Sequence, residues 1–224
     1  MKTTADKIIS FYQSLKSDWK LPSDIELLYP FSQEDTMDCV KQFYAKYFSD
    51  QASRTMILGI NPGRFGAGVT GVPFTDPWYM EEWCGIDNPF HKRKELSAIY
   101  IYELIDHYGG PEKFYSNFFI SSVCPLGFTK DGININCYDD KALQEAVIPH
   151  ILYYLELQLA MGFNTERVYI LGKGKNYAFF KKFNAEHKLF RQVIPLPHPR
   201  WVMQYRRKSK DDIAVEIIDA LLAR

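Results

Sequence analysis

The sequence lacks the features of membrane-spanning, secreted and metal-binding proteins. No stretch approaches the roughly 18 consecutive apolar residues that a membrane helix needs. Residues 1–16 alternate polar and apolar side chains at helical spacing, without the apolar segment of a signal peptide. The four cysteines (Cys39, Cys84, Cys124 and Cys137) form no C-x-x-C pair and match no zinc or iron–sulfur spacing. We therefore expect a cytoplasmic protein with reduced cysteines, no membrane association and no metal or other cofactor.

The chain also lacks an excess of charge of either sign. It has 27 Lys and Arg against 27 Asp and Glu. This balance argues against a protein that coats nucleic acid non-specifically, but it is compatible with an enzyme that has one basic face. A hydrophobic content of 46% and a length of 224 residues predict one globular domain over residues 1–224, with a helical segment at residues 1–50 packed on it.

Four short apolar strands alternate with helices along the chain. We expect strands at residues 55–60, 117–123, 167–171 and 190–196, and helices at about residues 3–15, 32–48, 95–107, 140–161, 175–184 and 209–222. Such alternation predicts an α/β fold in three layers, α/β/α, around a central, mostly parallel four-stranded sheet. The segment 74–93 is expected to be a loop with short helical turns.

The strand ends carry the candidate functional residues. In an α/β sheet, ligands bind outside the carboxyl ends of the strands. These ends would bring together Asn61, Ser122, the segment 172–175 and His198. The first strand runs into a glycine-rich loop that contains Gly63, which would let the backbone approach a phosphate, a sugar or a base.

Each candidate also has a structural interpretation when it is taken alone. Asn61 precedes a proline and is the kind of residue that caps a turn, and His198 lies between two prolines in what would be a rigid turn. Phe74 is of a type more often found in the core. The glycines and lysines at 172–175, with Lys173 and Lys175, lack both the P-loop and the dinucleotide-binding patterns.

The basic segment near the C-terminus could be a solvated surface. Two aromatic residues interleave with its cations, which favours contact with nucleic acid. The residues concerned are Arg200, Trp201, Tyr205, Arg206, Arg207 and Lys208.

Taken together, these motifs resemble the uracil-DNA glycosylase superfamily, in its single-strand-selective monofunctional branch. That branch has Gly-Met-Asn-Pro-Gly-Pro-Phe-Gly followed by Thr-Gly-Val-Pro-Phe, and residues 59–66 and 70–74 are similar. Weaker similarity runs through Trp83, Glu95 and Cys124-Pro125-Leu126. The ending His198-Pro199-Arg200-Trp201 is similar to the shortened motif of a second, bacterial subfamily.

The resemblance implies a base-excision repair enzyme that flips uracil out of DNA and hydrolyses its N-glycosidic bond. Asn61 would position the water, and His198 would donate a hydrogen bond to O2 of the leaving uracil. Phe74 would stack on the flipped base, and the backbone of the segment from Ile60 through Gly63 to Phe65 would support it.

Two departures from the family pattern affect this expectation. Ser122 stands where the family has an asparagine that reads the uracil edge, and one hydroxyl cannot span two ring positions, so a broader range of deaminated bases is plausible. The segment 200–210 replaces the family's wedge loop, with Trp201, Met203 or Tyr205 as candidates to enter the helix and Arg206, Arg207 and Lys208 to grip phosphates.

Two other hypotheses stay open at this point. One is an enzyme of similar fold that acts on free nucleobases or nucleotides, and the other is a catalytically silent DNA-binding module. The expected partner is DNA that contains uracil or another deaminated base, and the expected state is a monomer.

Overall fold

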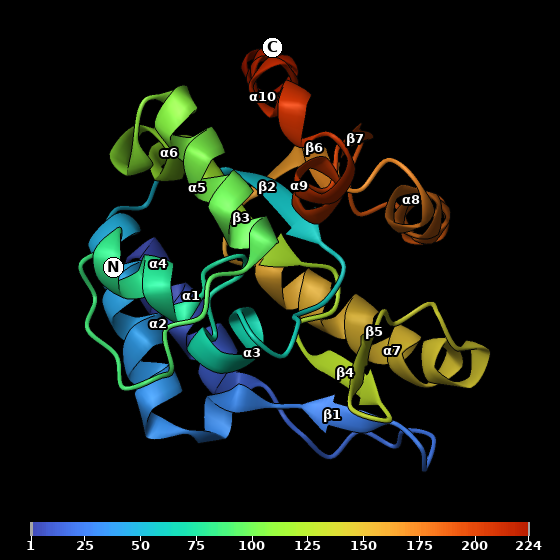
Figure 1. The fold of residues 1–224 in the computed structure, drawn as a ribbon. Coiled ribbons are helices and arrows are strands. Elements are labelled where there is room, and N and C mark those ends of the chain that lie inside the picture. The colour runs from blue at the N-terminus through green and yellow to red at the C-terminus, as the bar shows by residue number, and fades with distance from the viewer. Residues whose placement is uncertain (1, 224) are drawn as a thin grey trace.

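A parallel four-stranded sheet forms the centre of the computed structural model, which describes residues 2–223 (Figure 1). The strand order is β3-β2-β6-β7, with β2 at Thr55–Gly59, β3 at Phe118–Ser122, β6 at Asn164–Leu171 and β7 at Gln192–Leu196. Every neighbouring pair is parallel, so the carboxyl ends of the four strands meet at one edge. The expected α/β class, and the four strands that define it, are confirmed.

Helices cover both faces of this sheet. On one face, α1 packs on α2 and α7; on the other, α5 packs on α9 and α10. Their bounds are Thr4–Ser14 for α1, Glu34–Tyr47 for α2, Leu96–Tyr108 for α5, Lys141–Leu159 for α7, Pro199–Tyr205 for α9 and Lys210–Leu222 for α10. The remaining helices are α3 (Ala67–Thr70), α4 (Pro77–Glu82), α6 (Pro111–Asn117) and α8 (Lys175–His187).

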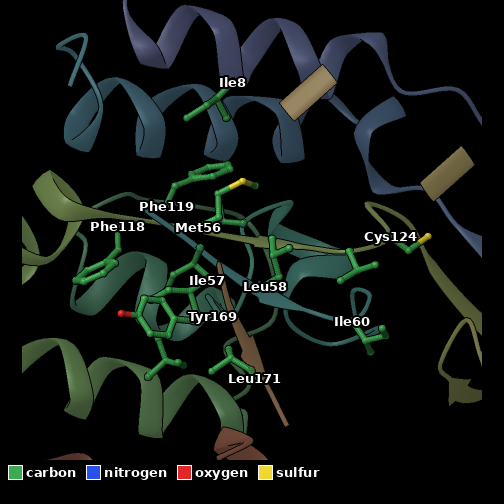
Figure 2. Packing of buried hydrophobic residues seen from close by; sticks show 14 of the residues in the cluster. Ile8, Met56, Ile57, Leu58, Ile60, Phe118, Phe119, Cys124, Tyr169 and Leu171 are labelled. Carbon is green, nitrogen blue, oxygen red and sulfur yellow. The ribbon is translucent and has the colours of Figure 1, made fainter. Parts of the chain in front are cut away.

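The strand side chains alternate between the two faces, as the pleat of a strand requires. Met56 and Phe119 point to the same side as Ile8 of α1, whereas Ile57 and Tyr169 point to the opposite side (Figure 2). All five side chains are buried. Two-sided burial explains why these strands are continuous apolar runs in the sequence.

A second, antiparallel sheet was not predicted. Its strand order is β1-β4-β5, with β1 at Glu26–Leu28, β4 at Gly127–Lys130 and β5 at Ile133–Ile135. The turn between β4 and β5 is Asp131-Gly132, and both residues have positive φ, 50° and 69°. An Asp-Gly dipeptide between alternating side chains is a strong hairpin signal, so the sequence did contain the information.

The segment after His198 is helical and not the loop that the family pattern suggested. His198 is the N-cap of α9, Pro199 occupies its first turn, and the 3₁₀ turn Arg207–Ser209 connects α9 to α10. Proline at the first helical position lacks an N–H that would have no partner there in any case. Met203 is buried on α9 and therefore cannot enter a DNA helix, which corrects one of the three expected wedge candidates.

Within residues 2–223, the helices are all too short or too polar to cross a lipid bilayer.

Candidate active site

A cavity of about 760 Å³ opens at the carboxyl edge of the parallel sheet. Several predicted site residues line it: Ile60, Asn61, Gly63, Phe65, Phe74, Ser122, His198 and Arg200. They come from the ends of β2, β3 and β7 and from the glycine-rich loop, so the parallel topology brings together segments that are far apart in the chain. The other predicted DNA-binding residues do not line it: Lys173, Lys175, Trp201, Tyr205, Arg206, Arg207 and Lys208.

The Asn61 side chain is held in one orientation by the backbone after β5. Its Nδ2 donates to the carbonyl of Ile135 at 3.2 Å, and its Oδ1 accepts the N–H of Cys137 at 3.0 Å. The oxygen keeps a second lone pair, whereas the second hydrogen of Nδ2 has only a long contact, 3.4 Å, with the carbonyl of Pro62. The partly buried amide can therefore hold a water molecule in a fixed position.

The geometry of His198 determines which ring nitrogen carries the proton. Nδ1 accepts the backbone N–H of Arg200 at 3.1 Å, so in the neutral ring the proton lies on Nε2. Burial of the ring, and secondarily the positive charge of Arg200, lowers the pKa of His198 from 6.5 to about 4. At neutral pH, His198 is therefore an uncharged donor through Nε2.

Phe74 adopts a backbone conformation that is rare for a residue with a side chain. Its φ is 55°, in the left-handed region. The turn is stabilised by Thr70, whose hydroxyl donates to the carbonyl of Thr75 at 2.6 Å and accepts the N–H of Val72 at 3.2 Å. This conformation places the ring against Gly59, with its centroid 6.3 Å from that of His198.

The close packing explains the glycine at the end of β2. A Cβ on Gly59 would lie 2.9 Å from Cε2 and Cζ of Phe74, too close for ordinary contact. The ring of Phe74 therefore lies on a bare stretch of backbone, and it forms one flat wall of the cavity beside His198.

Ser122 ends β3 next to Gly59, at the same edge as Asn61. It is 6% exposed, and its hydroxyl makes no hydrogen bond to any group between residues 2 and 223. The preceding hydroxyl, on Ser121, donates to Oε1 of Gln158 at 2.6 Å on the opposite face. Ser122 thus presents one free hydroxyl to the cavity.

Cations and one aromatic ring form the rim on the side of the glycine-rich loop. The guanidinium groups of Arg64 and Arg93 lie 4.5 and 3.9 Å from the ring centre of Phe65. Stacking of this kind orients a guanidinium, and Arg64 in addition donates from its side chain to the carbonyl of Gly132. Arg64 also donates its backbone N–H to Oδ1 of Asn134 at 3.2 Å, which ties the loop to β5.

A carboxylate is also present in the cavity wall. Burial, and then the neighbouring charge of Asp76, raise the pKa of Glu95, whereas Arg200 and Arg93 oppose this shift. Asp76 is fully buried and accepts the backbone N–H of Glu95 at 2.7 Å. The pair fixes the segment that carries Arg93 and Lys94 along the cavity rim.

Apart from Arg200, the predicted DNA-binding residues on α9, after it and near the start of α8 lie outside the cavity and are exposed. Trp201 is 42% exposed and Tyr205 is 67% exposed. The guanidinium of Arg206 lies 5.2 Å from the ring centre of Trp201. In the part of the chain that the structure describes, no carboxylate lies within salt-bridge distance of the following cations: Lys173, Lys175, Arg200, Arg206, Arg207 and Lys208.

Sequence reasoning missed several lining residues, of which Asn176 and the β5 segment are the most informative. Asn176 is buried on α8; its Nδ2 donates to the carbonyl of Leu171 at 2.7 Å, and its Oδ1 accepts the hydroxyl of Tyr138. No local pattern identifies a single asparagine on a helix. Only the Asp131-Gly132 turn signal could have located the β5 segment.

Over residues 2–223, no cluster of three His, Cys, Asp or Glu side chains could hold a metal ion.

Comparison with known proteins gives a consistent family assignment. Residues 45–222 match the profile described as the uracil DNA glycosylase superfamily. Single-strand selective monofunctional uracil DNA glycosylase from Bos taurus is 27% identical over 37% of this chain, and the Mus musculus protein is 26% identical over 38%. The aligned part spans 37% of the length of each of these two mammalian relatives.

A solved structure is similar over nearly the whole chain. The crystal structure of wild-type Pedobacter heparinus SMUG2 superposes with a TM-score of 0.94 and is 44% identical, covering 98% of this chain and 97% of that one.

Proposed function

The chain belongs to the uracil DNA glycosylase superfamily, and we propose that it is a monofunctional glycosylase of base-excision repair that removes uracil from DNA. The observation that carries the proposal is the pair Asn61 and His198, which share one cavity as a fixed amide and an uncharged donor. A catalytically silent DNA-binding module would have no need of the Asn61 and His198 pair. An enzyme that acts on free nucleobases or nucleotides would have no need of the exposed cations on α9 and in the turn after it.

Cleavage starts with departure of the base. An amide cannot accept a proton near neutrality, so Asn61 cannot turn water into hydroxide. The N-glycosidic bond must therefore break largely before water attacks, which leaves negative charge on the uracil ring, partly at O2. We assign to His198 the role of donating its Nε2–H to this oxygen. One such donor typically contributes about 3 kcal/mol to transition-state stabilisation.

The neutral state of His198 suits this role. A donor that is already uncharged stabilises the anionic base without losing a proton to it and without costly desolvation of a buried charge. Water held by the Asn61 amide then adds to the sugar at C1′, and its released proton passes to solvent or to the departed base. The atoms balance as one water consumed, one free base and one abasic site formed.

The flipped base would lie between Phe74 and the glycine-rich loop. The ring of Phe74 offers a flat surface for stacking, and the backbone of Ile60 to Phe65 offers N–H and carbonyl groups at the opposite wall. Ser122 contributes one hydroxyl, which can donate or accept at a single ring position only. We therefore propose that the enzyme also accepts other deaminated bases, such as hypoxanthine and xanthine.

The free cations would bind the DNA backbone. Arg200, Arg206, Arg207 and Lys208 follow the cavity mouth along α9 and the turn after it, and Lys173 and Lys175 precede α8. Exposed cations without carboxylate partners can neutralise phosphates and release counterions. We propose that the protein acts as a monomer, since one chain supplies Asn61, His198, Phe74 and Ser122, the groups that the proposed reaction needs.

The direct test is alkali-induced strand cleavage of labelled oligonucleotides that carry one uracil, hypoxanthine or xanthine. Cleavage at uracil by the wild-type protein, lost in Asn61→Ala, supports the glycosylase activity. Cleavage at the other two bases would support the broader range assigned to Ser122. Folded wild-type protein that cleaves none of the three would contradict the proposed function.

A further inference from the structure

The hairpin of β4 and β5 places one apolar residue, Ile133, at the mouth of the cavity. Its two-residue turn, Asp131-Gly132, has positive φ at both positions, which is the geometry of a tight hairpin. The carboxyl ends of β2 and β3 lie between this hairpin and α9 (Figure 1). Ile133, directly after the turn, lines the same cavity as Asn61 and His198.

Packing against the core does not explain the position of Ile133. It is 66% exposed, whereas Ile135, on the same face of β5, packs against the core. A single exposed apolar residue is ordinary on a protein surface. Here, however, the side chain lines a cavity that is proposed to receive an extruded base, as does the exposed Leu96.

The hairpin is firmly connected to the catalytic groups. Asn134 accepts the backbone N–H of Arg64, and the Arg64 side chain donates to the carbonyl of Gly132. The far end of β5 holds the Asn61 amide through the carbonyl of Ile135. The hydrogen bonds of Gly132, before Ile133, and of Asn134 and Ile135, after it, therefore fix the position of Ile133 relative to Asn61.

The charges of the hairpin disfavour a role in binding phosphate. Asp131 at the tip is exposed and negative, and Lys130 is already paired with Asp24 at 2.6 Å and lies 3.6 Å from Asp140. Ile133, and not the charged turn, is therefore the group of this hairpin that could contact bases. Isoleucine is one of the residues that proteins insert between stacked bases.

We propose that Ile133 is a wedge that enters duplex DNA at the position of the flipped nucleotide, on the side of the cavity opposite α9. This inference rests on the proposed glycosylase function and adds a second element to DNA opening, besides Trp201 and Tyr205. A wedge matters only where bases are stacked in a duplex. Ile133 should therefore affect double-stranded substrates and leave single-stranded ones nearly unchanged.

The test compares kcat/KM for one uracil in single-stranded and in double-stranded DNA. In Ile133→Ala, we expect the ratio of double- to single-stranded activity to fall by about tenfold, and Ile133→Val should restore most of it. The single-stranded rate is the internal control, because Asn61 is needed equally for both substrates. Val215→Ala, which changes a residue 54% exposed on α10, is the matched surface control.

A binding measurement separates this inference from the catalytic proposal. The fluorescence of 2-aminopurine next to an abasic site in a duplex rises when neighbouring bases unstack. We expect wild-type protein to raise it, and Ile133→Ala to raise it much less at saturating protein. A ratio and a fluorescence response equal to wild type would overturn the wedge, whereas loss of all cleavage by the wild type would overturn the proposed function alone.

Discussion

Side chains in the cavity and side chains on α9 are held in different ways. Asn61 bonds backbone groups of a distant segment, His198 bonds the backbone of its own helix, and Phe74 lies in a strained turn against bare backbone. On α9, Trp201, Tyr205 and the cations around them stand in solvent. The cavity is built for fixed geometry, which bond cleavage requires, and the α9 surface for adaptable contact, which a flexible polyanion requires.

This contrast predicts which step of the reaction a substitution in each region should affect. A change in the cavity should reduce the chemical step strongly at any salt concentration. A change on α9 should mainly reduce DNA binding, by an amount that depends on salt.

The largest effect is expected for Asn61→Ala. Loss of the amide proposed to position water should lower kcat by about 1,000-fold, because correct orientation of a reactant is worth several kcal/mol. The measurement is single-turnover cleavage of single-stranded uracil DNA. Asn134→Ala is the control: it removes an amide from the same wall that bonds Arg64 and not the water, and we expect less than about a tenfold change.

Asn61→Ala must also be shown to fold. The substitution leaves the carbonyl of Ile135 and the N–H of Cys137 without their side-chain partner, at a cost of about 1–2 kcal/mol in unfolding free energy. Thermal unfolding should show a modest decrease and binding to an abasic-site duplex should persist. A full cleavage rate in the folded variant would remove Asn61 from the chemistry.

His198→Ala should have the next largest effect. Without the Nε2 donor, kcat should fall by about 100-fold, the magnitude seen when one donor to a developing oxyanion is lost. His198→Asn separates this role from structure, since asparagine caps helices well but its shorter amide does not reproduce the imidazole donor. Both variants should therefore be slow, with α9 better preserved in the asparagine variant by circular dichroism.

The pH profile provides a second check on His198. Because its folded-state pKa is lowered from 6.5 to about 4, the ring stays neutral, and activity should show no decline from this residue between pH 8 and pH 5. The unfolded chain takes up the proton first, so His198 contributes stability that is lost as pH falls from about 6.5 towards 4. An activity loss centred near pH 6.5 that vanishes in His198→Ala would contradict this assignment.

A smaller effect is expected for Gly59→Ala. The new methyl group would meet the ring of Phe74 at 2.9 Å and push it into the base-binding space. We expect kcat/KM to fall by about tenfold, mostly through a higher KM, in steady-state kinetics on uracil DNA. Gly174→Ala is the matched control, because a Cβ there meets nothing within 4 Å. An equal loss of kcat/KM in both variants would show that displacement of the Phe74 ring is not its cause.

The smallest effect on chemistry is expected on α9 and the turn after it. Replacement of Arg206 and Arg207 by glutamine should leave kcat unchanged and reduce the slope of log Kd against log salt by about 1.8 for duplex DNA, or 0.9 for each lost phosphate contact. Fluorescence anisotropy at several salt concentrations measures this. As the control, replacement of Lys188 and Arg191, which precede β7, by glutamine should leave the slope unchanged. An unchanged slope in the Arg206 and Arg207 variant would mean that these two residues bind no phosphate.

The sequence alone determined the parallel sheet and most of the cavity. Apolar runs identified β2, β3, β6 and β7, of which the edge strand β7 is only partly buried. Asn61, Ser122 and His198 lie at or just after the ends of three of them, and they had to meet at one edge because parallel strands share their direction. Local patterns of this kind depend only on neighbours in the chain, so they can be recognised without coordinates.

Only the tertiary structure decided how those residues are held and what surrounds them. The Asn61 amide is fixed by Ile135 and Cys137, more than seventy positions later, and Asn176 reaches the wall from α8. The proton on Nε2 of His198 follows from a backbone N–H that becomes available only once α9 forms. The orientation of Asn61 comes from long-range hydrogen bonds, which no local sequence pattern encodes, and the state of His198 from the helix that follows it and from burial of the ring.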